Sequence, residues 1–310
     1  MILNKMKRYI VDSGYRFSVN DSHGFYDSLS DEKYLKKKYY SKFHKHLNLK
    51  KPTSLNEKLQ WLKLNDRKPL YTQLVDKIEV KNIVSNVIGE EYIIPTIGVW
   101  DSFSDIDFTN LPNQFVLKCS HDSGGLIICR DKSSFDINYA KDLINSSLNR
   151  NYYDVGREWP YKDVKPRIFA EKYMEENPSA NGGSKGLTDY KFFCFNGSPL
   201  LLYVSRGLEY HPTAEISFYG MDGIEKEFHR SDYKPYHNAK MPSNFPEMKI
   251  TAEKLAKFVD CPFVRIDLYS INNKIYFSEI TFSPCSGFIP FEPMSTDVEL
   301  GKLLDIPQSK

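Results

Sequence analysis

A chain of 310 residues is long enough for one large domain or two lobes, and at this length about 75% of the unfolded surface is buried on folding. The composition, with 41% hydrophobic and 26% charged residues, is that of a globular protein, and a formal net charge of only +2 gives no global electrostatic case for nucleic-acid binding. The five cysteines form no CxxC pair and no apolar run is long enough to cross a bilayer, so we expect no disulfide framework, no transmembrane segment and a cytoplasmic location.

Residues 1–68 are polar, locally basic and helical in pattern. Within them, residues 33–45 (KYLKKKYYSKFHK) interleave Lys with Tyr and Phe, and two interpretations stay open. One is a solvated helix face whose aromatic rings pack inward, and the other is a patch that meets an anionic acceptor or a membrane surface. Ser54 and Glu57 have the spacing of a capping box, which predicts a helix that runs through Leu64.

The middle of the chain alternates helices with short strands. Periodic apolar residues predict a helix over 71–88 that ends at Gly89, and a second, amphipathic helix over 136–150. Strands are expected at 92–95, 115–119, 126–129 and 167–174. The polar turn 120–125 joins two of these strands, and its glycines give the backbone unusual freedom.

The second half of the chain is dominated by hairpins. The expected elements, in order, are a mobile loop at 177–186, strands at 189–195 and 200–205, a helix at 251–259, and strands at 263–269 and 274–280. The Asn196-Gly197 turn is the strongest short hairpin signal in the chain. Helices mixed with mostly antiparallel hairpins predict an α+β fold.

Lys118 and the turn that follows it form a candidate phosphate site. Lys118 ends a predicted strand two residues before SHDSGG at 120–125, so a cation on a rigid strand stands beside mobile backbone N–H groups. Lys77, which follows Asp76, is a weaker candidate for a second phosphate contact. His121 lies inside the turn, and it is either a solvated loop histidine or a lid residue that touches phosphate or acts as a base.

The last hairpin carries charged residues in apolar strands. Alternation places Arg265 and Asp267 on one face of the first strand, and Glu279 and Thr281 on one face of the second. Buried acidic side chains are costly unless they are paired or bind a cation. The two interpretations are therefore a salt bridge to Arg265 or a Mg²⁺ site, and the small-residue loop SPCSG at 283–287 gives a ligand room to approach.

Arg-x-Asp, followed by Glu-x-Thr and Ser-Pro-x-Ser-Gly, resembles the Mg²⁺-binding end of ATP-grasp enzymes. The resemblance implies ATP and Mg²⁺ as cofactors, Asp267 and Glu279 as metal ligands, Thr281 at the place of the superfamily's Asn, and Arg265 beside the acylphosphate. The other implied ATP-site residues are the phosphate lysines Lys77 and Lys118, the glycine-lid residues His121, Ser123, Gly124 and Gly125, the hinge residues Glu171, Tyr173 and Met174, and Lys191 near the transferring phosphate.

Several stretches are more narrowly similar to the TupA-like ATP-grasp family of polysaccharide gene clusters. They are LNEKLQWLKLNDR, DK, LPNQFVLKCSHDSGG, GREWPYKDVKPRIFAEKYM, DYKFFCFNG and SEITFSPCSG, which together extend over most of the chain, from 50 to 305. The likeness implies two lobes, 69–170 and 171–310, whose antiparallel sheets clasp ATP, after a helical extension at 1–68.

The implied activity is ADP-forming carboxylate–amine ligation through an acylphosphate. It would attach an amino acid or amine to a sugar acid during capsule, teichuronopeptide or O-antigen synthesis. The implied partners are a small-molecule or lipid-linked saccharide that carries a carboxylate, and an amine, with peripheral contact at the inner membrane face and no nucleic acid.

Two other functions stay open. A kinase with the same cleft would phosphorylate a sugar hydroxyl, and a glycosyltransferase of the same pathway would use a nucleotide-sugar, although no loop carries a transferase DxD. We expect Cys285 to pack as a small hydrophobe, because no base is apparent that would make it a nucleophile. Arg157, Trp159 and Tyr161 form an exposed-looking cluster that either faces the acceptor or packs against the lid.

Overall fold

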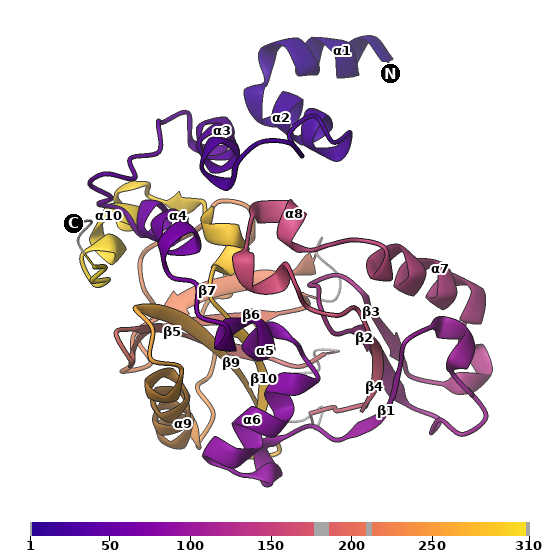
Figure 1. The fold of residues 1–310 in the computed structure, drawn as a ribbon. Helices are drawn as coiled ribbons and strands as arrows, with labels where there is room; N and C mark the ends of the chain where they lie inside the picture. The colour runs from indigo at the N-terminus through magenta and orange to yellow at the C-terminus, as the bar shows by residue number, and fades with distance from the viewer. Residues whose placement is uncertain (1, 177–185, 209–212, 308–310) are drawn as a thin grey trace.

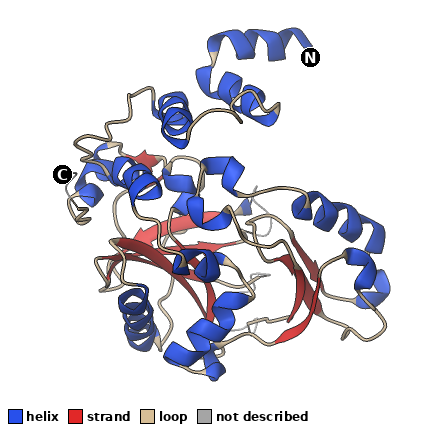
Figure 2. Ribbon diagram, viewed as in Figure 1, coloured by secondary structure: helices blue, strands red, loops and turns tan. Residues whose placement is uncertain are grey.

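Two antiparallel sheets form the body of the protein, with helices around them (Figures 1 and 2). The computed structural model describes residues 2–176, 186–208 and 213–307, so the predicted loop at 177–186 lies almost entirely outside the described residues. The smaller sheet has the strand order β1-β4-β2-β3 and the larger one β10-β9-β5-β6-β7. This arrangement confirms the predicted α+β class.

The N-terminal region is helical, as predicted. Its helices are α1 (Ile2–Val11), α2 (Ser13–Ser22), α3 (Asp31–Phe43) and α4 (Leu55–Asn65). The capping box of Ser54 and Glu57 is present at the start of α4. Tyr34 and Tyr39 of α3 are buried, which confirms that these two rings pack inward, whereas Tyr40 is exposed. In the described part of the chain, no helix combines the length and apolarity that a bilayer span requires.

The predicted helix over 71–88 is broken in the structure. It forms α5 (Leu70–Val75) and α6 (Glu79–Ile88), with an extended backbone at Asp76. The break occurs because Oδ1 of Asp76 accepts hydrogen bonds from the backbone N–H groups of Ile78, at 2.8 Å, and Glu79, at 3.3 Å, as an N-cap does. The break also lets the Lys77 N–H donate to the Ser120 carbonyl at 3.0 Å.

The smaller sheet separates a core from the cleft. Its strands are β1 (Thr96–Trp100), β2 (Phe115–Cys119), β3 (Leu126–Cys129) and β4 (Ile168–Lys172), and α7 (Ile137–Leu148) covers one face. Phe115, Leu117 and Ala170 point into that core, so Lys118 and Glu171 point to the other face. The predicted strand at 92–95 is wrong, because residues 90–92 form a 3-10 turn, Ile93 makes only an isolated bridge to Phe277, and the strand β1 begins at Thr96.

The back of the larger sheet is buried, and its front is apolar where α4 packs on Phe193, Phe195 and Phe218 and polar where it faces the smaller sheet. Its strands are β5 (Asp189–Phe195), β6 (Ser198–Arg206), β7 (Glu215–Tyr219), β9 (Phe263–Ile271) and β10 (Lys274–Thr281). The helix α9 (Phe245–Val259) packs on the back against Phe192, Ile266 and Leu268, together with α5 and α6. The front carries Lys191 and Asp267 toward the smaller sheet.

Several short elements complete the fold. They are α8 (Tyr153–Gly156), the two-stranded pair of β8 (His229–Arg230) with β11 (Phe291–Glu292), a 3-10 turn η6 (Pro284–Gly287), and α10 (Ser295–Gly301). The turn η6 follows β10 directly, so it begins where the acidic hairpin ends.

Candidate active site

A cavity of about 850 Å³ lies between the two sheets, a size typical of small-molecule sites. Of the residues proposed from the sequence, those that line it are Lys77, Lys118, Ser123, Gly124, Gly125, Glu171, Tyr173, Met174, Lys191 and Glu279. Both sheets and the glycine turn contribute to this set. The cavity therefore gathers residues from segments far apart in the sequence into one site.

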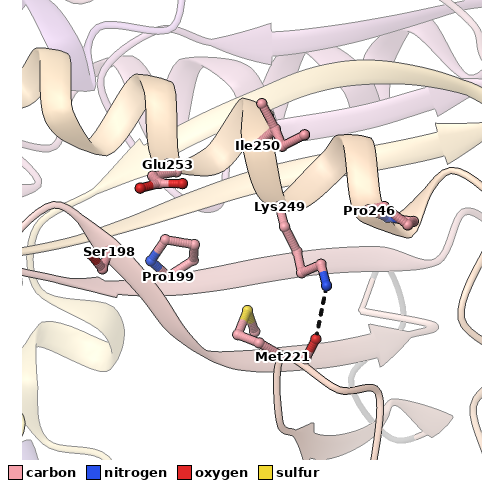
Figure 3. Close-up of a pocket in the computed structure, with 7 residues that line it drawn as sticks. All are labelled: Ser198, Pro199, Met221, Pro246, Lys249, Ile250 and Glu253. Carbon is pink, nitrogen blue, oxygen red and sulfur yellow. Dashed lines mark hydrogen bonds between the residues drawn. The ribbon is translucent and has the colours of Figure 1, made fainter.

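A second hollow on the back of the larger sheet differs in character (Figure 3). It is shallow and mostly apolar, and its lining residues are Ser198, Pro199, Met221, Pro246, Lys249, Ile250 and Glu253. The Lys249 ammonium donates to the Met221 carbonyl at 3.1 Å. With its cation bound to the backbone, this hollow lacks the convergent charges of the cavity between the sheets.

The smaller sheet presents a carboxylate held between two lysines. Glu171 Oε2 lies 2.5 Å from Lys118 Nζ, and Oε1 lies 2.5 Å from Nζ of Lys81 on α6. Burial raises the pKa of Glu171, but the two lysines outweigh burial and lower it. Lys81 was not predicted from the sequence, because nothing in its local pattern distinguishes it from other helix lysines.

Asp122 anchors the glycine turn. Its Oδ1 accepts from the backbone N–H groups of Gly124, at 3.3 Å, and Gly125, at 3.0 Å. Its Oδ2 accepts from Ser147 Oγ and, at 3.3 Å, from Arg150 Nη2. The Asp-Ser-Gly-Gly sequence was the available signal, since a short acidic side chain often bonds the backbone two residues on. The turn is thus fixed at its base while Ser123 and Gly124 line the cavity.

His121 is buried, so the expectation of a solvated loop histidine is wrong. Its Nε2 lies 3.1 Å from the carbonyl oxygens of both Ser147 and Arg150. Its Nδ1 has no hydrogen-bond partner among the described residues. This geometry ties the turn to the end of α7, and the ring does not line the cavity, so the chemical role proposed for His121 has no support in the contacts.

The acidic hairpin brings four predicted residues together. A bulge between Phe277 and Glu279 shifts the register, so that Glu279 stands opposite Asp267 and Thr281 opposite Arg265. Nη2 of Arg265 lies 2.6 Å from Asp267 Oδ2, 2.7 Å from Glu279 Oε1 and 3.0 Å from Thr281 Oγ1. One guanidinium therefore bridges both carboxylates.

Lys191 completes this cluster from the neighbouring strand. Its Nζ lies 2.8 Å from Asp267 Oδ2 and 3.1 Å from Asp189 Oδ1. Burial tends to lower the pKa of Lys191, but the two carboxylates raise it above its usual value. Burial likewise favours neutral Glu279, yet the charges of Arg265, Lys77 and Lys191 lower its pKa to about 2. Glu279 is therefore a carboxylate at neutral pH.

The hairpin fits Mg²⁺ in part. Mg²⁺ takes hard oxygen ligands and usually binds through one or two carboxylates with phosphate oxygens and water. Glu279 lines the cavity and fits this role directly. Asp267 is fully buried, and both its oxygens accept bonds from Arg265 and Lys191, so it fits only after one of these cations moves. Among the described residues, no group of three or more His, Cys, Asp or Glu side chains is placed to hold a metal ion.

One face of α4 donates hydrogen bonds to the loop that follows the acidic hairpin. Asn56, Gln60 and Lys63 follow one another at helical spacing, and each donates to a backbone carbonyl of residues 286–289. Lys63 Nζ lies 2.8 Å from the Ser286 carbonyl oxygen and 2.6 Å from that of Gly156. Burial lowers the pKa of Lys63 to about 7. The available sequence signal for this contact was the polar stripe of Asn56, Gln60 and Lys63 at i, i+4 and i+7. It was overlooked because the capping box and the apolar residues of the same helix were the more obvious patterns.

The loop itself is held in an unusual backbone conformation. Cys285 and Ser286 both have positive φ, at 52° and 54°, and Ser286 Oγ donates to Glu158 at 2.7 Å. Cys285 is exposed, so the expectation that it packs is wrong; Arg230 Nη1 lies 2.9 Å from its sulfur. The loop is thus held by polar contacts to Glu158 and Arg230, and it does not line the cavity between the sheets.

The GREWPY segment packs inward. Arg157 and Tyr161 are buried, so their predicted exposure is wrong. The Arg157 guanidinium lies 4.6 Å from the Tyr34 ring centroid and 5.1 Å from that of Tyr153, which stabilises its burial. The segment thereby connects α3 to the loop through Glu158.

Comparisons with known proteins found a matching family model and several similar solved structures. A family model described as TupA-like ATPgrasp matches residues 57–305. D-alanine–D-alanine ligase from Bacillus anthracis complexed with ATP is 17% identical, with a TM-score of 0.37 over 68% of this chain and 55% of that chain. The Helicobacter pylori D-alanine–D-alanine ligase is 16% identical, with a TM-score of 0.42 over 82% of this chain and 70% of that one.

The ATP-grasp ligase PsnB, complexed with a phosphomimetic variant of a minimal precursor, Mg and ADP, is 10% identical, with a TM-score of 0.41 over 85% of this chain and 65% of that chain. The chain thus spans little more than half the length of the Bacillus anthracis ligase. No curated protein matches it. Because the family model covers most of the chain, the protein belongs to the TupA-like ATP-grasp family and has the ATP-grasp fold.

Proposed function

We propose that the protein is an ATP-dependent carboxylate–amine ligase that forms an amide through an acylphosphate and releases ADP and phosphate. The observation that carries the proposal is the cavity between the sheets, where lysines of the smaller sheet and the glycine turn face a carboxylate cluster on the larger one. Membership of an ATP-grasp family supports the same conclusion.

The cations of the site would neutralise the triphosphate. Lys118 and Lys77 reach the cavity from the side of the glycine turn, and Lys191 reaches it from the opposite sheet. The glycine turn would cover the phosphates through Ser123 and Gly124, which line the cavity, while Asp122 holds the base of the turn by accepting from the Gly124 and Gly125 N–H groups. Positioning and charge stabilisation, rather than covalent chemistry by the protein, account for most of the rate in phosphoryl transfer.

The acidic hairpin would hold the metal. Glu279, and Asp267 after release from its cations, are the residues that would bind Mg²⁺, which when bound supplies Lewis-acid stabilisation of phosphate oxygens. Arg265 would then orient an oxygen of the acylphosphate, because its guanidinium already lies between the two strands. Thr281, bonded to the same guanidinium, would position it.

The substrates follow from the family. We propose a sugar acid, free or on a lipid-linked saccharide, as the carboxylate and an amino acid or amine as the acceptor, in cell-surface polysaccharide synthesis on the cytoplasmic side of the membrane. The exposed Cys285 and the Ser286 loop border the metal hairpin and would receive these substrates. Tyr173 and Met174 would contact the adenine from the hinge.

The test is a product assay. Protein, ATP and Mg²⁺ are incubated with panels of uronic sugars and amino acids, singly and in pairs, and ADP and free phosphate are measured. We expect phosphate only when a carboxylate and an amine are both present. ADP without phosphate, with a phosphorylated sugar, would support a kinase instead, and turnover of a nucleotide-sugar without ATP would support a glycosyltransferase.

A further inference from the structure

The charge of the chain is concentrated at one end. Residues 1–51 hold twelve Lys and Arg against five Asp and Glu, a formal +7, whereas the whole chain, with 42 against 40, carries only +2. The rest of the protein is therefore net negative. The helices of this basic region, α1 to α3, lie on one side of the body and α1 stands farthest from the sheets (Figure 1).

The helix α1 leaves apolar side chains uncovered. Met6 is 61% exposed and Ile10 is 70% exposed, and they lie one helical turn apart on the same face. Val11 is 72% exposed at the end of the helix. Large apolar side chains exposed together on one helix normally meet a partner.

Polar bonds, rather than these apolar side chains, fix α1 to α2. Tyr9 Oη donates to Asn20 Oδ1 at 2.6 Å, and Arg16 Nη1 donates to the carbonyl oxygens of Ile10, at 2.7 Å, and Tyr9, at 3.1 Å. The helix is thus held in place while Met6 and Ile10 face solvent.

We propose that α1 docks the protein on an anionic membrane surface. Met6 and Ile10 would enter the headgroup layer, while the exposed Lys5 and Lys7 would contact lipid phosphates. Ten residues are far too few to cross a bilayer, so the helix would lie in the plane of the interface. The combination of an apolar stripe with flanking lysines matches an anionic lipid surface better than a neutral one. The inference rests on the proposed function only in that a lipid-linked acceptor would explain why the enzyme works there.

The experiment is co-sedimentation of the full chain with vesicles, without ATP. Vesicles of phosphatidylcholine alone are compared with vesicles that contain about 30% phosphatidylglycerol. We expect binding to the anionic vesicles that is lost in about 1 M salt, where charges are screened within about 3 Å. The double variant M6S/I10S should bind roughly tenfold more weakly or worse, and K5Q/K7Q should lose most of the salt dependence.

A matched control removes exposed apolar residues elsewhere. Ile224 and Ile250 are 64% and 66% exposed, and I224S/I250S should bind like the wild type. Equal binding to neutral vesicles, no binding, or full binding by M6S/I10S would overturn the proposal. So would a wild-type dimer in solution that M6S/I10S abolishes without any vesicle binding, because α1 would then meet a second copy. Ligation of soluble substrates should be unchanged in the α1 variants, so a failure here is distinct from a failure of the ligase proposal.

Discussion

Glu279 stands directly opposite Asp267 in the pairing of β9 with β10, and a bulge immediately before Glu279 sets this register. Without that bulge, the residues of β10 beyond it would point to the other face of the sheet, because side chains alternate along a strand. The geometry of the acidic hairpin therefore depends on one irregular residue as much as on its two carboxylates.

Replacing Glu279 by Gln tests the proposed role of this carboxylate as a Mg²⁺ ligand. We expect a loss of about 10²-fold or more in ligation turnover, the scale of one strong electrostatic contact in a transition state. The loss should be accompanied by a higher Mg²⁺ requirement in the ADP-release assay. The control Glu253→Gln changes a surface glutamate of α9 and should leave turnover unchanged. Near-normal turnover of Glu279→Gln would count against the site.

Lys118→Ala tests the opposite wall of the cavity. Glu171 would then keep only Lys81 as a cation, and the triphosphate would lose a direct contact. We expect turnover to fall by about 10²-fold, with weaker ATP binding measured by calorimetry. Lys141→Ala, on the exposed side of α7, is the matched control. A variant that binds ATP as tightly as the wild type contradicts the assignment.

Asp122→Ala tests whether the glycine turn needs its anchor. The variant removes the acceptor for the Gly124 and Gly125 N–H groups, so the turn should close less well over the phosphates. Hydrogen bonds to a charged group contribute about 1.5–3 kcal/mol, which predicts at least a tenfold rise in KM for ATP. The exposed Asp142→Ala serves as control. An unchanged KM would show that the turn is fixed by other contacts.

Lys63 predicts an unusual dependence of stability on pH. Burial lowers its pKa from 10.5 to about 7, so between these values the native state binds fewer protons than the unfolded chain. Stability contributed by Lys63 therefore rises as pH increases from about 7 to about 10. Urea unfolding of wild type and Lys63→Met across this range should show a steeper rise for the wild type. Parallel curves would mean that Lys63 is an ordinary charged lysine in the native protein.

Gly156→Ala tests the packing of Gly156 against Ser286 in the loop at 283–287. A Cβ at Gly156 would lie 2.4 Å from Ser286 Oγ and 2.5 Å from Ser286 Cβ, so the loop must move. Overpacking of this kind costs about 1–3 kcal/mol, and ligation should fall more than ATP binding does. The double variant G156A/S286G should recover part of the stability, because glycine removes the clash and accepts the positive φ but leaves Glu158 without the Ser286 hydroxyl donor. Failure of the double variant to recover would place the defect outside this contact.

Local patterns predicted a large part of the fold. The strands at 115–119, 126–129 and 189–195 match the structure, because each alternates or runs apolar between clear turn signals. The break at Asp76 was missed because the apolar periodicity runs through it, although an aspartate can cap the turn that follows, as Asp76 does here. The strand β1 was missed because none of its residues is buried, so its sequence lacks the alternation of apolar and polar residues that marks a half-buried strand.

Site residues could be predicted from the sequence where they belong to motifs that occur in the order of the ATP-grasp resemblance. Residues outside those motifs could not be predicted. Lys118 and Glu279 line the cavity as the resemblance implied. Lys81 was missed because its partner Glu171 lies 90 residues away in the sequence, and Asp122 because its Ser147 contact depends on the packing of α7. The burial of His121 was missed for the same reason.

The grip of α4 on the loop at 286–289 sets where a working unit can start. Asn56, Gln60 and Lys63 belong to the first quarter of the chain, yet they donate to carbonyl groups of the loop that follows the acidic hairpin. A fragment that began after residue 68 would keep Lys118 and Glu279 and leave those carbonyls without donors. If the proposed function holds, such a fragment should keep nucleotide binding and lose ligation. The proposed catalytic unit therefore has to include α4, so it begins no later than Ser54.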